Sequence, residues 1–347
     1  MIGRISLGAA LLCTAMAVAS PAFANGLIVS GNGTTRIGIN DDGSLDANTS
    51  VGTIGIGYNF TGQGSRVGFQ DALSPGCFCE AWGVSYNGTT GGQVGRSTGN
   101  QNITVLASSG GTSNNASAAA PVLSFTSNTV MTGLGVTQVF SQGATTATGA
   151  LFKDTVTLTN STGAAITNLR FARAMDWDVP PTEFREFVTI KGTATTTSLV
   201  RSTNDGFANA NPLTAVANTG IGGVPVNTDL TDVGPRDHGA LFVFDFGGLA
   251  NGATYTFDIF YGAGADEADA LTLLSGISPE LYSLGQSTAA AGGANNVFPT
   301  FVFAFRGVKG SVVVPPRGVP EPLTLSLFGA GLAGAIAAGR RRKAKAA

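Results

Sequence analysis

Asp176 and Asp178, which flank a tryptophan, are the residues of this 347-residue chain best placed for chemistry. On an extended strand, residues two apart point to the same face, so the two carboxylates would lie close together. Such a pair needs a cation, an arginine partner or a raised pKa. Hard oxygen ligands suit Ca²⁺, so one prediction is a calcium site. The alternative is that one aspartate caps the turn at residues 180–181 and the other pairs with Arg173 or Arg185.

The cysteines Cys77 and Cys79 are separated by a single residue. In an oxidising compartment, two thiols this close tend to pair, although the ring that they close is small and strained. We therefore expect a local disulfide, with free thiols or metal and redox chemistry as the alternatives. His238 is the only histidine, and no second cysteine pair completes a zinc site.

Catalytic motifs are weak, and no catalytic residue is predicted. Residues 95–99 match the G-x-S-x-G string of a nucleophile elbow, but no strand or helix pattern flanks them. The acidic turn at residues 40–46 fails as an EF-hand loop, because Gly38 and Thr49 occupy the two end positions that need carboxylates. We expect a β-turn with solvated carboxylates there and a structural role for His238.

Two tryptophans, Trp82 and Trp177, are candidates for contact with sugar rings, near the acidic pair Asp176 and Asp178. Exposed aromatic rings would make the chain a carbohydrate-binding module. The two carboxylates could instead carry out glycoside hydrolysis, which requires a set separation between them. The alternative for the aromatic rings is that they fill the core.

The elements that position these residues read as strands. Fifty glycines and short runs of β-branched and aromatic residues favour an all-β fold, an antiparallel β-sandwich. Residues 153–159 alternate apolar and polar side chains, and with residues 166–177 they predict a hairpin. Residues 265–283 predict a short helical segment, broken near Pro279.

The folded part forms either one large β unit or two smaller modules. A stretch poor in apolar residues suggests a boundary between an N-terminal module at 25–115 and a main sandwich at 116–314. Residues 315–318 then act as a linker.

The N-terminus predicts export. Arg4 precedes an apolar stretch of signal-peptide length, and Ala22-Phe23-Ala24 provides a small-x-small cleavage pattern, so residues 1–24 are expected to be a signal peptide read by Sec-type machinery. Removing Arg4, the five tail cations and Glu321 from 19 basic and 21 acidic residues leaves 13 and 20. An acidic domain without a basic patch argues against nucleic-acid binding.

The C-terminus combines three features: the motif Val319, Pro320, Glu321 and Pro322; an apolar run at 323–339; and the basic residues Arg340, Arg341, Arg342 and Lys343. The run predicts a transmembrane helix, and the basic residues would hold its end on the cytoplasmic side. This arrangement resembles the PEP-CTERM sorting signal of Gram-negative bacteria, at residues 319–347. The resemblance implies recognition by an exosortase, with cleavage at or near the motif.

The central stretches 174–184 and 237–247 resemble secreted bacterial β proteins of unknown role. Together with the two termini, these patterns predict an exported protein with transient inner-membrane anchoring, then release to the cell surface or the extracellular matrix. We expect it to be non-enzymatic and associated with exopolysaccharide. The alternatives are a carbohydrate-binding module and a secreted polysaccharide-active enzyme. No cofactor is expected other than Ca²⁺.

Overall fold

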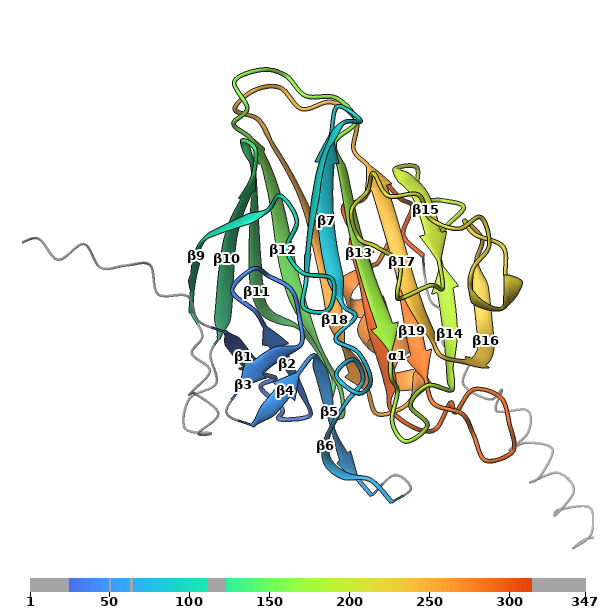
Figure 1. The fold of residues 1–347 in the computed structure, drawn as a ribbon. Helices are drawn as coiled ribbons and strands as arrows, with labels where there is room; N and C mark the ends of the chain where they lie inside the picture. The colour runs from blue at the N-terminus through green and yellow to red at the C-terminus, as the bar shows by residue number, and fades with distance from the viewer. Residues whose placement is uncertain (1–24, 50, 63–64, 111–122, 314–347) are drawn as a thin grey trace, which may run out of the picture.

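Alternation of buried and half-exposed side chains determines where the long strands lie. In β12 (Ala150–Asn160), Val156 and Leu158 are buried while Thr155 and Thr157 are half-exposed. β-Branched residues suit such a pleated surface with one face covered. The computed structural model describes residues 25–49, 51–62, 65–110 and 123–313, and most of its regular structure consists of antiparallel strands (Figure 1).

The strands and helices follow one another along the chain in this order. They are β1 (Gly26–Val29), β2 (Thr35–Ile39), β3 (Ala47–Thr49), β4 (Gly52–Ile54), β5 (Ile56–Thr61), β6 (Val67–Asp71), β7 (Ala81–Tyr86), β8 (Thr90–Gly95), β9 (Thr104–Ser109), β10 (Ser124–Met131), β11 (Leu134–Thr145), β12, β13 (Arg170–Trp177), β14 (Glu186–Lys191), β15 (Leu199–Thr203), the 3₁₀ turn η1 (Ile221–Gly223), β16 (Leu230–Arg236), β17 (His238–Asp245), β18 (Thr254–Gly264), α1 (Glu267–Ile277), β19 (Leu281–Gln286) and β20 (Thr300–Arg306).

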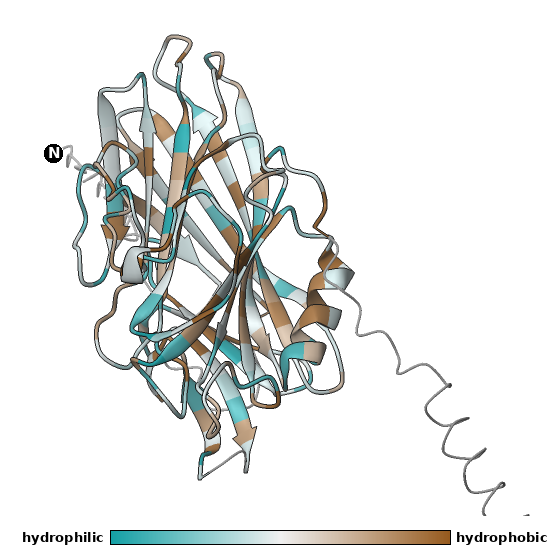
Figure 2. Ribbon diagram, turned by 90° about the vertical axis from the view of Figure 1, so that its right-hand side faces the viewer, coloured by the Kyte–Doolittle hydropathy of each residue, from teal (hydrophilic) through white to brown (hydrophobic). Residues whose placement is uncertain are grey.

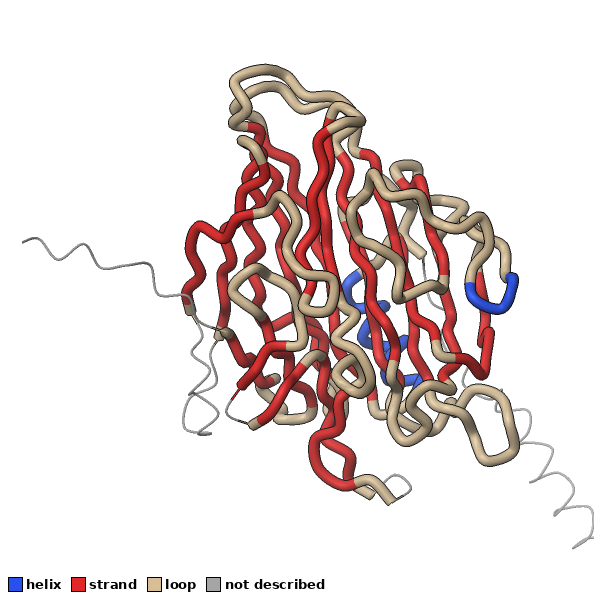
Figure 3. The backbone as a smooth tube through the Cα atoms, in the orientation of Figure 1, coloured by secondary structure: helices blue, strands red, loops and turns tan. Residues whose placement is uncertain are grey.

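Two large sheets pack face to face. One has the order β16-β14-β19-β20-β18-β12-β11-β10-β9, and the other has the order β15-β17-β13-β7-β8. A small sheet of β1-β2-β5-β6 and the pair β3-β4 lie toward the lower left in Figure 1. Loops gather at both ends of the long strands, as Figure 3 shows. Side chains near the strand ends are therefore brought together by loops from distant parts of the sequence.

Aromatic rings fill the space between the two large sheets. Phe242 of β17 contacts Phe303 and Phe305 of β20, with ring centroids 5.5 Å apart in each pair. Phe171 of β13 meets Phe257 of β18 edge to face at 5.0 Å. Such pairs add about 0.5–1.5 kcal/mol each beyond the area that they bury.

The helix α1 covers the outer face of the nine-stranded sheet (Figure 2). Leu273, Leu274 and Ile277 pack there against residues of β12, β18, β19 and β20. Asp266 caps its first turn by accepting a hydrogen bond from the Asp269 N–H. The helix ends at Ile277, the next residue Ser278 has a left-handed backbone conformation, and β19 begins at Leu281. Residues 281–283 are therefore strand, and the helix predicted over 265–283 is shorter than expected.

Two other expectations need correction. The strands β12 and β13 exist, but they form no hairpin, because β12 pairs with β11 and β18 while β13 pairs with β7 and β17. The connection between them crosses from one sheet to the other. Strands before and after residue 115 also share both large sheets, since β7 pairs with β13 and β9 pairs with β10. The structure thus does not match a division into two modules at that point.

The predicted signal peptide at 1–24, the linker at 315–318 and the sorting signal at 319–347 lie outside the described residues. Within the described ranges, no helix has the length and apolar character needed to span a membrane.

Candidate functional site

Three carboxylates meet at one end of the five-stranded sheet. Asp176 lies near the end of β13, and Asp178 follows that strand directly. The register of β13 with β17 places Asp176 opposite Gly239, so that Asp237, just before β17, lies beside the pair. One carboxylate oxygen from each of Asp176, Asp178 and Asp237 lies within 4.8 Å of the other two. Two aspartates two residues apart thus converge with a third that comes from 59 residues later in the chain.

The charges of this cluster have no cationic partner among the residues that the structure describes. Asp178 is 0% exposed, and neither of its carboxylate oxygens accepts a hydrogen bond in the structure. Asp176 is 3% exposed and its Oδ1 is also unpaired, whereas Asp237 is exposed. No ion pair of the described residues includes any of the three. An ionised carboxylate that is buried without a hydrogen bond or an opposite charge lowers the stability of the folded state.

Burial raises the pKa of each carboxyl group in the cluster. It raises the pKa of Asp178 to about 9, and the neighbouring carboxylates of Asp176 and Glu186 act in the same direction. The pKa of Asp176 rises to about 8, mainly through burial and then through Asp237. Burial also raises the pKa of Glu186, the first residue of β14, to about 9. Without a cation, the cluster therefore retains protons at neutral pH.

The three aspartates have the composition and spacing for a hard divalent cation. Ca²⁺ binds oxygen ligands at about 2.3–2.6 Å, so two oxygens on one ion lie at most about 5 Å apart. The 4.8 Å limit among Asp176, Asp178 and Asp237 falls within that span. Three carboxylates occupy fewer positions than the six to eight that Ca²⁺ takes, which leaves room for solvent on the exposed side of Asp237.

The loop between β6 and β7, residues 72–80, covers the cluster. The Asp178 N–H donates to the carbonyl oxygen of Ala72 at 2.8 Å. Gly76 has a φ of +77°, and a Cβ atom there would lie 3.6 Å from Asp178 Oδ2 and 2.7 Å from the ring of Phe184. Phe184 itself has a φ of 69°, an unfavourable conformation for a bulky residue. The backbone thus approaches the carboxylates closely, and only glycine fits at that point.

The disulfide between Cys77 and Cys79, the pairing that the sequence favours, lies in the same loop. Cys77 Sγ lies 3.6 Å from Asp176 Oδ2. Because a disulfide sulfur carries no proton, this contact leaves Asp176 without a hydrogen-bond donor. The two sulfurs and one oxygen of Asp176 lie within 4.8 Å of one another.

The arginine proposed as an alternative partner is occupied elsewhere. Arg173 faces the interior between the two sheets and forms an ion pair with Glu80, with Asp154 Oδ2 at 3.7 Å. Its guanidinium also donates to Gln138 Oε1 at 2.8 Å and to the carbonyl of Gly43 at 3.1 Å. Side chains alternate along β13, so Arg173 and Asp176 point to opposite faces. Nor does Arg185 form an ion pair with the cluster in the described part of the chain.

The prediction of sugar contact through Trp82 and Trp177 is wrong for this structure. Both side chains are 0% exposed. Trp177 packs against Phe301 and donates from Nε1 to Ser283 Oγ at 3.3 Å. Trp82 stacks on Phe171, so both rings fill the core, as the alternative held.

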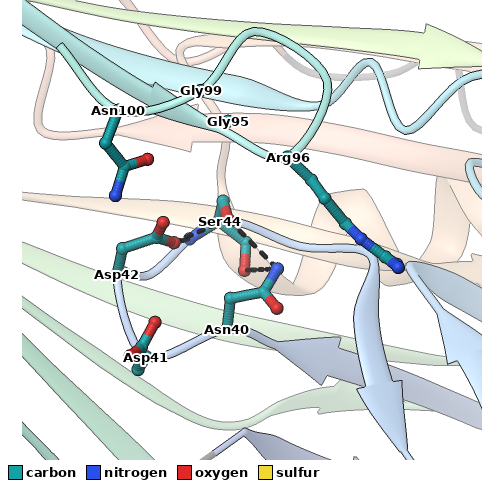
Figure 4. A pocket seen from close by; sticks show the side chains of 8 residues that line it. All are labelled: Asn40, Asp41, Asp42, Ser44, Gly95, Arg96, Gly99 and Asn100. Atoms are coloured by element: carbon teal, nitrogen blue, oxygen red, sulfur yellow. Dashed lines mark hydrogen bonds between the residues drawn. The ribbon is translucent and has the colours of Figure 1, made fainter. Parts of the chain in front are cut away.

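The acidic turn at residues 40–46 lines a separate polar pocket of about 210 Å³, shown in Figure 4. Asp42 is 8% exposed, and its Oδ1 accepts hydrogen bonds from the backbone N–H and hydroxyl of Ser44. Asp46 is fully buried and accepts from Ser74 Oγ. The prediction of solvated carboxylates is therefore wrong for Asp42 and Asp46. Both side chains form hydrogen bonds inside the protein, Asp42 with Ser44 and Asp46 with Ser74.

The remaining motifs are structural. Residues 95–99 form the end of β8 and a following turn, and in the described chain no helix begins there, so they do not build a nucleophile elbow. His238 is buried, with Nδ1 beside Asn204 Nδ2 and Nε2 beside the carbonyl of Glu186. Burial lowers its pKa to about 4, so the ring is neutral. The neutral ring accepts a hydrogen bond from Asn204 Nδ2 and donates one to the carbonyl oxygen of Glu186. The second bond links β17 to β14.

Sequence reasoning missed Asp237 as a member of the cluster, and it missed Glu186 as a nearby carboxylate that helps to raise the pKa of Asp178. Asp237 is next to the only histidine, which drew attention to hydrolytic pairing instead, and Glu186 carries no local signal at all. Only the pairing of β13 with β17 and the position of β14 bring them close. No family model, curated protein or solved structure matches this chain.

Proposed function

We propose that the chain is an exported, non-enzymatic protein of the cell surface or extracellular matrix, whose β-sandwich binds a structural Ca²⁺ ion at Asp176, Asp178 and Asp237. The observation that carries the calcium site is Asp178, which is fully buried with both carboxylate oxygens unpaired between two other aspartates. A divalent cation supplies the positive charge that no described side chain supplies.

The proposal gives the ion a defined physical role. Asp176 lies near the end of β13, Asp178 follows that strand and Asp237 precedes β17, so one ion would join the ends of two neighbouring strands. The extracellular space supplies calcium at the millimolar level that suits modest-affinity sites of exported modules. The site would then be empty during synthesis and filled after export, which adds stability where the protein works.

The burial of the cluster disfavours the polysaccharide-active enzyme. A glycosidase needs its two carboxylates on either side of a sugar, with substrate between them. Here Asp176 and Asp178 are 3% and 0% exposed, and the loop at 72–80 lies against them. The module alternative loses its contact residues, because Trp82 and Trp177 are in the core.

Export, exosortase processing and association with exopolysaccharide enter the proposal through the sequence of the two termini. Intact-mass measurement of the protein from its producing cells tests this part. We expect an N-terminus after Ala24 and a C-terminus near residues 319–322. A mature chain that still ends at Ala347 in cells with an active exosortase would remove the sorting claim.

Isothermal titration of Ca²⁺ tests the site. We expect one ion per chain for the parent protein, and at least tenfold weaker binding for Asp178→Asn. Asp258→Asn is the matched control, because Asp258 forms a surface ion pair with Arg306 and lies outside the cluster. Equal calcium affinity in the parent protein and in Asp178→Asn would contradict the assignment.

A further inference from the structure

The disulfide of the covering loop shares a residue with the carboxylate cluster. Cys77 Sγ, Cys79 Sγ and a carboxylate oxygen of Asp176 all lie within 4.8 Å of one another. The same aspartate contributes to the group with Asp178 and Asp237. Asp176 is 3% exposed and its Oδ1 is unpaired, so this side chain is a buried ligand without a partner. It lies between two soft sulfur atoms on one side and two hard carboxylates on the other.

We propose that the reduced protein contains a second metal site, for a thiophilic ion such as Zn²⁺, formed by Cys77, Cys79 and Asp176. A dithiol reductant gives two electrons and two protons to the disulfide. The bond between Cys77 and Cys79 breaks, two thiols form, and the sulfurs of the reductant become a disulfide. Zinc then binds the two thiolates and the carboxylate, and the displaced protons pass to solvent.

The local geometry is suited to a tetrahedral ion. Zinc binds thiolate sulfur at about 2.3 Å and carboxylate oxygen at about 2.0–2.2 Å, which places two sulfurs on one ion about 3.8 Å apart. The Cα atoms of Cys77 and Cys79 are 5.2 Å apart, so side-chain rotation can open that space. Both cysteines are half-buried, which leaves the fourth position of the ion to solvent. Zinc is found in proteins with three protein ligands and a water molecule in the fourth position.

The two sites exclude each other because both use Asp176. In the oxidised protein the sulfurs are bonded to each other, and Asp176 is available to the oxygen site. In the reduced protein zinc draws Asp176 into the thiolate site. This competition depends on the proposed calcium function, whereas zinc binding by the reduced protein does not.

Zinc titration of the full-length chain tests the inference. The protein is used oxidised, and after reduction with a phosphine, with binding followed by calorimetry. We expect one zinc per reduced chain, bound at least tenfold more tightly than by the oxidised chain. The double variant Cys77→Ser with Cys79→Ser should show no increase in zinc affinity after reduction and should still bind calcium. Asp178→Asn should bind calcium at least tenfold more weakly and should still bind zinc more tightly when reduced than when oxidised.

A measurement on the unmutated protein guards against variants that do not fold. Zinc should lower the rate at which both reduced thiols are alkylated at least tenfold, as followed by mass spectrometry, and calcium should leave that rate unchanged. Equal zinc affinity in the oxidised and reduced chains, or unprotected thiols, would overturn the thiolate site. Zinc and calcium bound together without competition would overturn the shared use of Asp176. If the oxidised, unmutated protein binds no calcium while the reduced protein still binds zinc, the calcium function is overturned and the zinc site is not.

Discussion

The unpaired Asp178 predicts an unusual dependence of stability on pH. Its pKa is about 9 in the folded protein and about 4 in an unfolded chain. The folded state therefore binds the proton more strongly, and this contribution to stability is fully present below pH ~4 and lost as the pH rises toward 9. Each proton held only by the folded state changes the free energy of unfolding by about 1.4 kcal/mol per pH unit.

Between pH 5 and pH 8, Asp178 alone should therefore lower the free energy of unfolding by about 4 kcal/mol in calcium-free protein. Asp176 titrates in the same direction, because burial raises its pKa to about 8. Asp178→Asn removes the titrating group at this position and should flatten the pH dependence by that amount. The Asn side chain keeps the shape of the site and carries no charge.

Calcium should oppose this loss. An ion present at a hundred times its dissociation constant adds about 2.7 kcal/mol to the native state. For a folded part of this size, that corresponds to a rise in Tm of about 4–5 °C. The rise should be larger at pH 8 than at pH 5, because protons compete with calcium for the same oxygens.

Thermal and urea unfolding at pH 5, 6, 7 and 8, with a chelator or with millimolar calcium, measures both effects. Asp245→Asn is the control, since Asp245 pairs with Arg170 at the surface. If the stability of the chelator-treated parent protein is flat from pH 5 to pH 8, the reasoning on buried carboxylates fails. If calcium raises the Tm of Asp178→Asn as much as that of the parent, the ion binds elsewhere.

Three further substitutions, the first with a control variant, test the core and the helix by urea unfolding. Arg173→Met should cost about 3–5 kcal/mol, because it leaves two buried carboxylates without their cation; Arg170→Met on the same strand removes a surface pair and should cost less than about 1 kcal/mol. Trp82→Ala should cost about 3–5 kcal/mol, and an unchanged stability would contradict its place in the core. Asp266→Ala should cost about 1 kcal/mol by removing the cap of α1, with a matching loss of helical signal.

Local patterns were sufficient to predict where several strands lie and that Asp176 and Asp178 share one face of a strand. The alternation in β12 depends on side chains that point to opposite faces, so it is readable without the fold. The same rule placed Asp176 and Asp178 on one face. It also separates Arg173 from Asp176, because residues three apart on a strand point to opposite faces, but it could not say what covers either face. Arg173 proved to lie on the other face, in the interior with Glu80.

Strand pairing was beyond the reach of local patterns. The hairpin expected from β12 and β13 failed because strands close in sequence joined different sheets. For the same reason Asp237 was missed, since its approach to Asp176 follows from the register of β13 with β17. Side chains such as Trp82 and Trp177 were ambiguous, because an aromatic residue suits both a binding face and a core.

The sequence by itself determined that the chain is rich in strands, that its folded part is acidic and that Cys77 and Cys79 are close enough to pair. These properties depend on composition and on neighbours along the chain. Only the tertiary structure decided that three aspartates, two of them buried, share one site, that the disulfide lies against Asp176 and that both tryptophans are in the core. Burial and proximity come from contacts between distant segments, and such contacts produce no periodic pattern of residues in a single sequence.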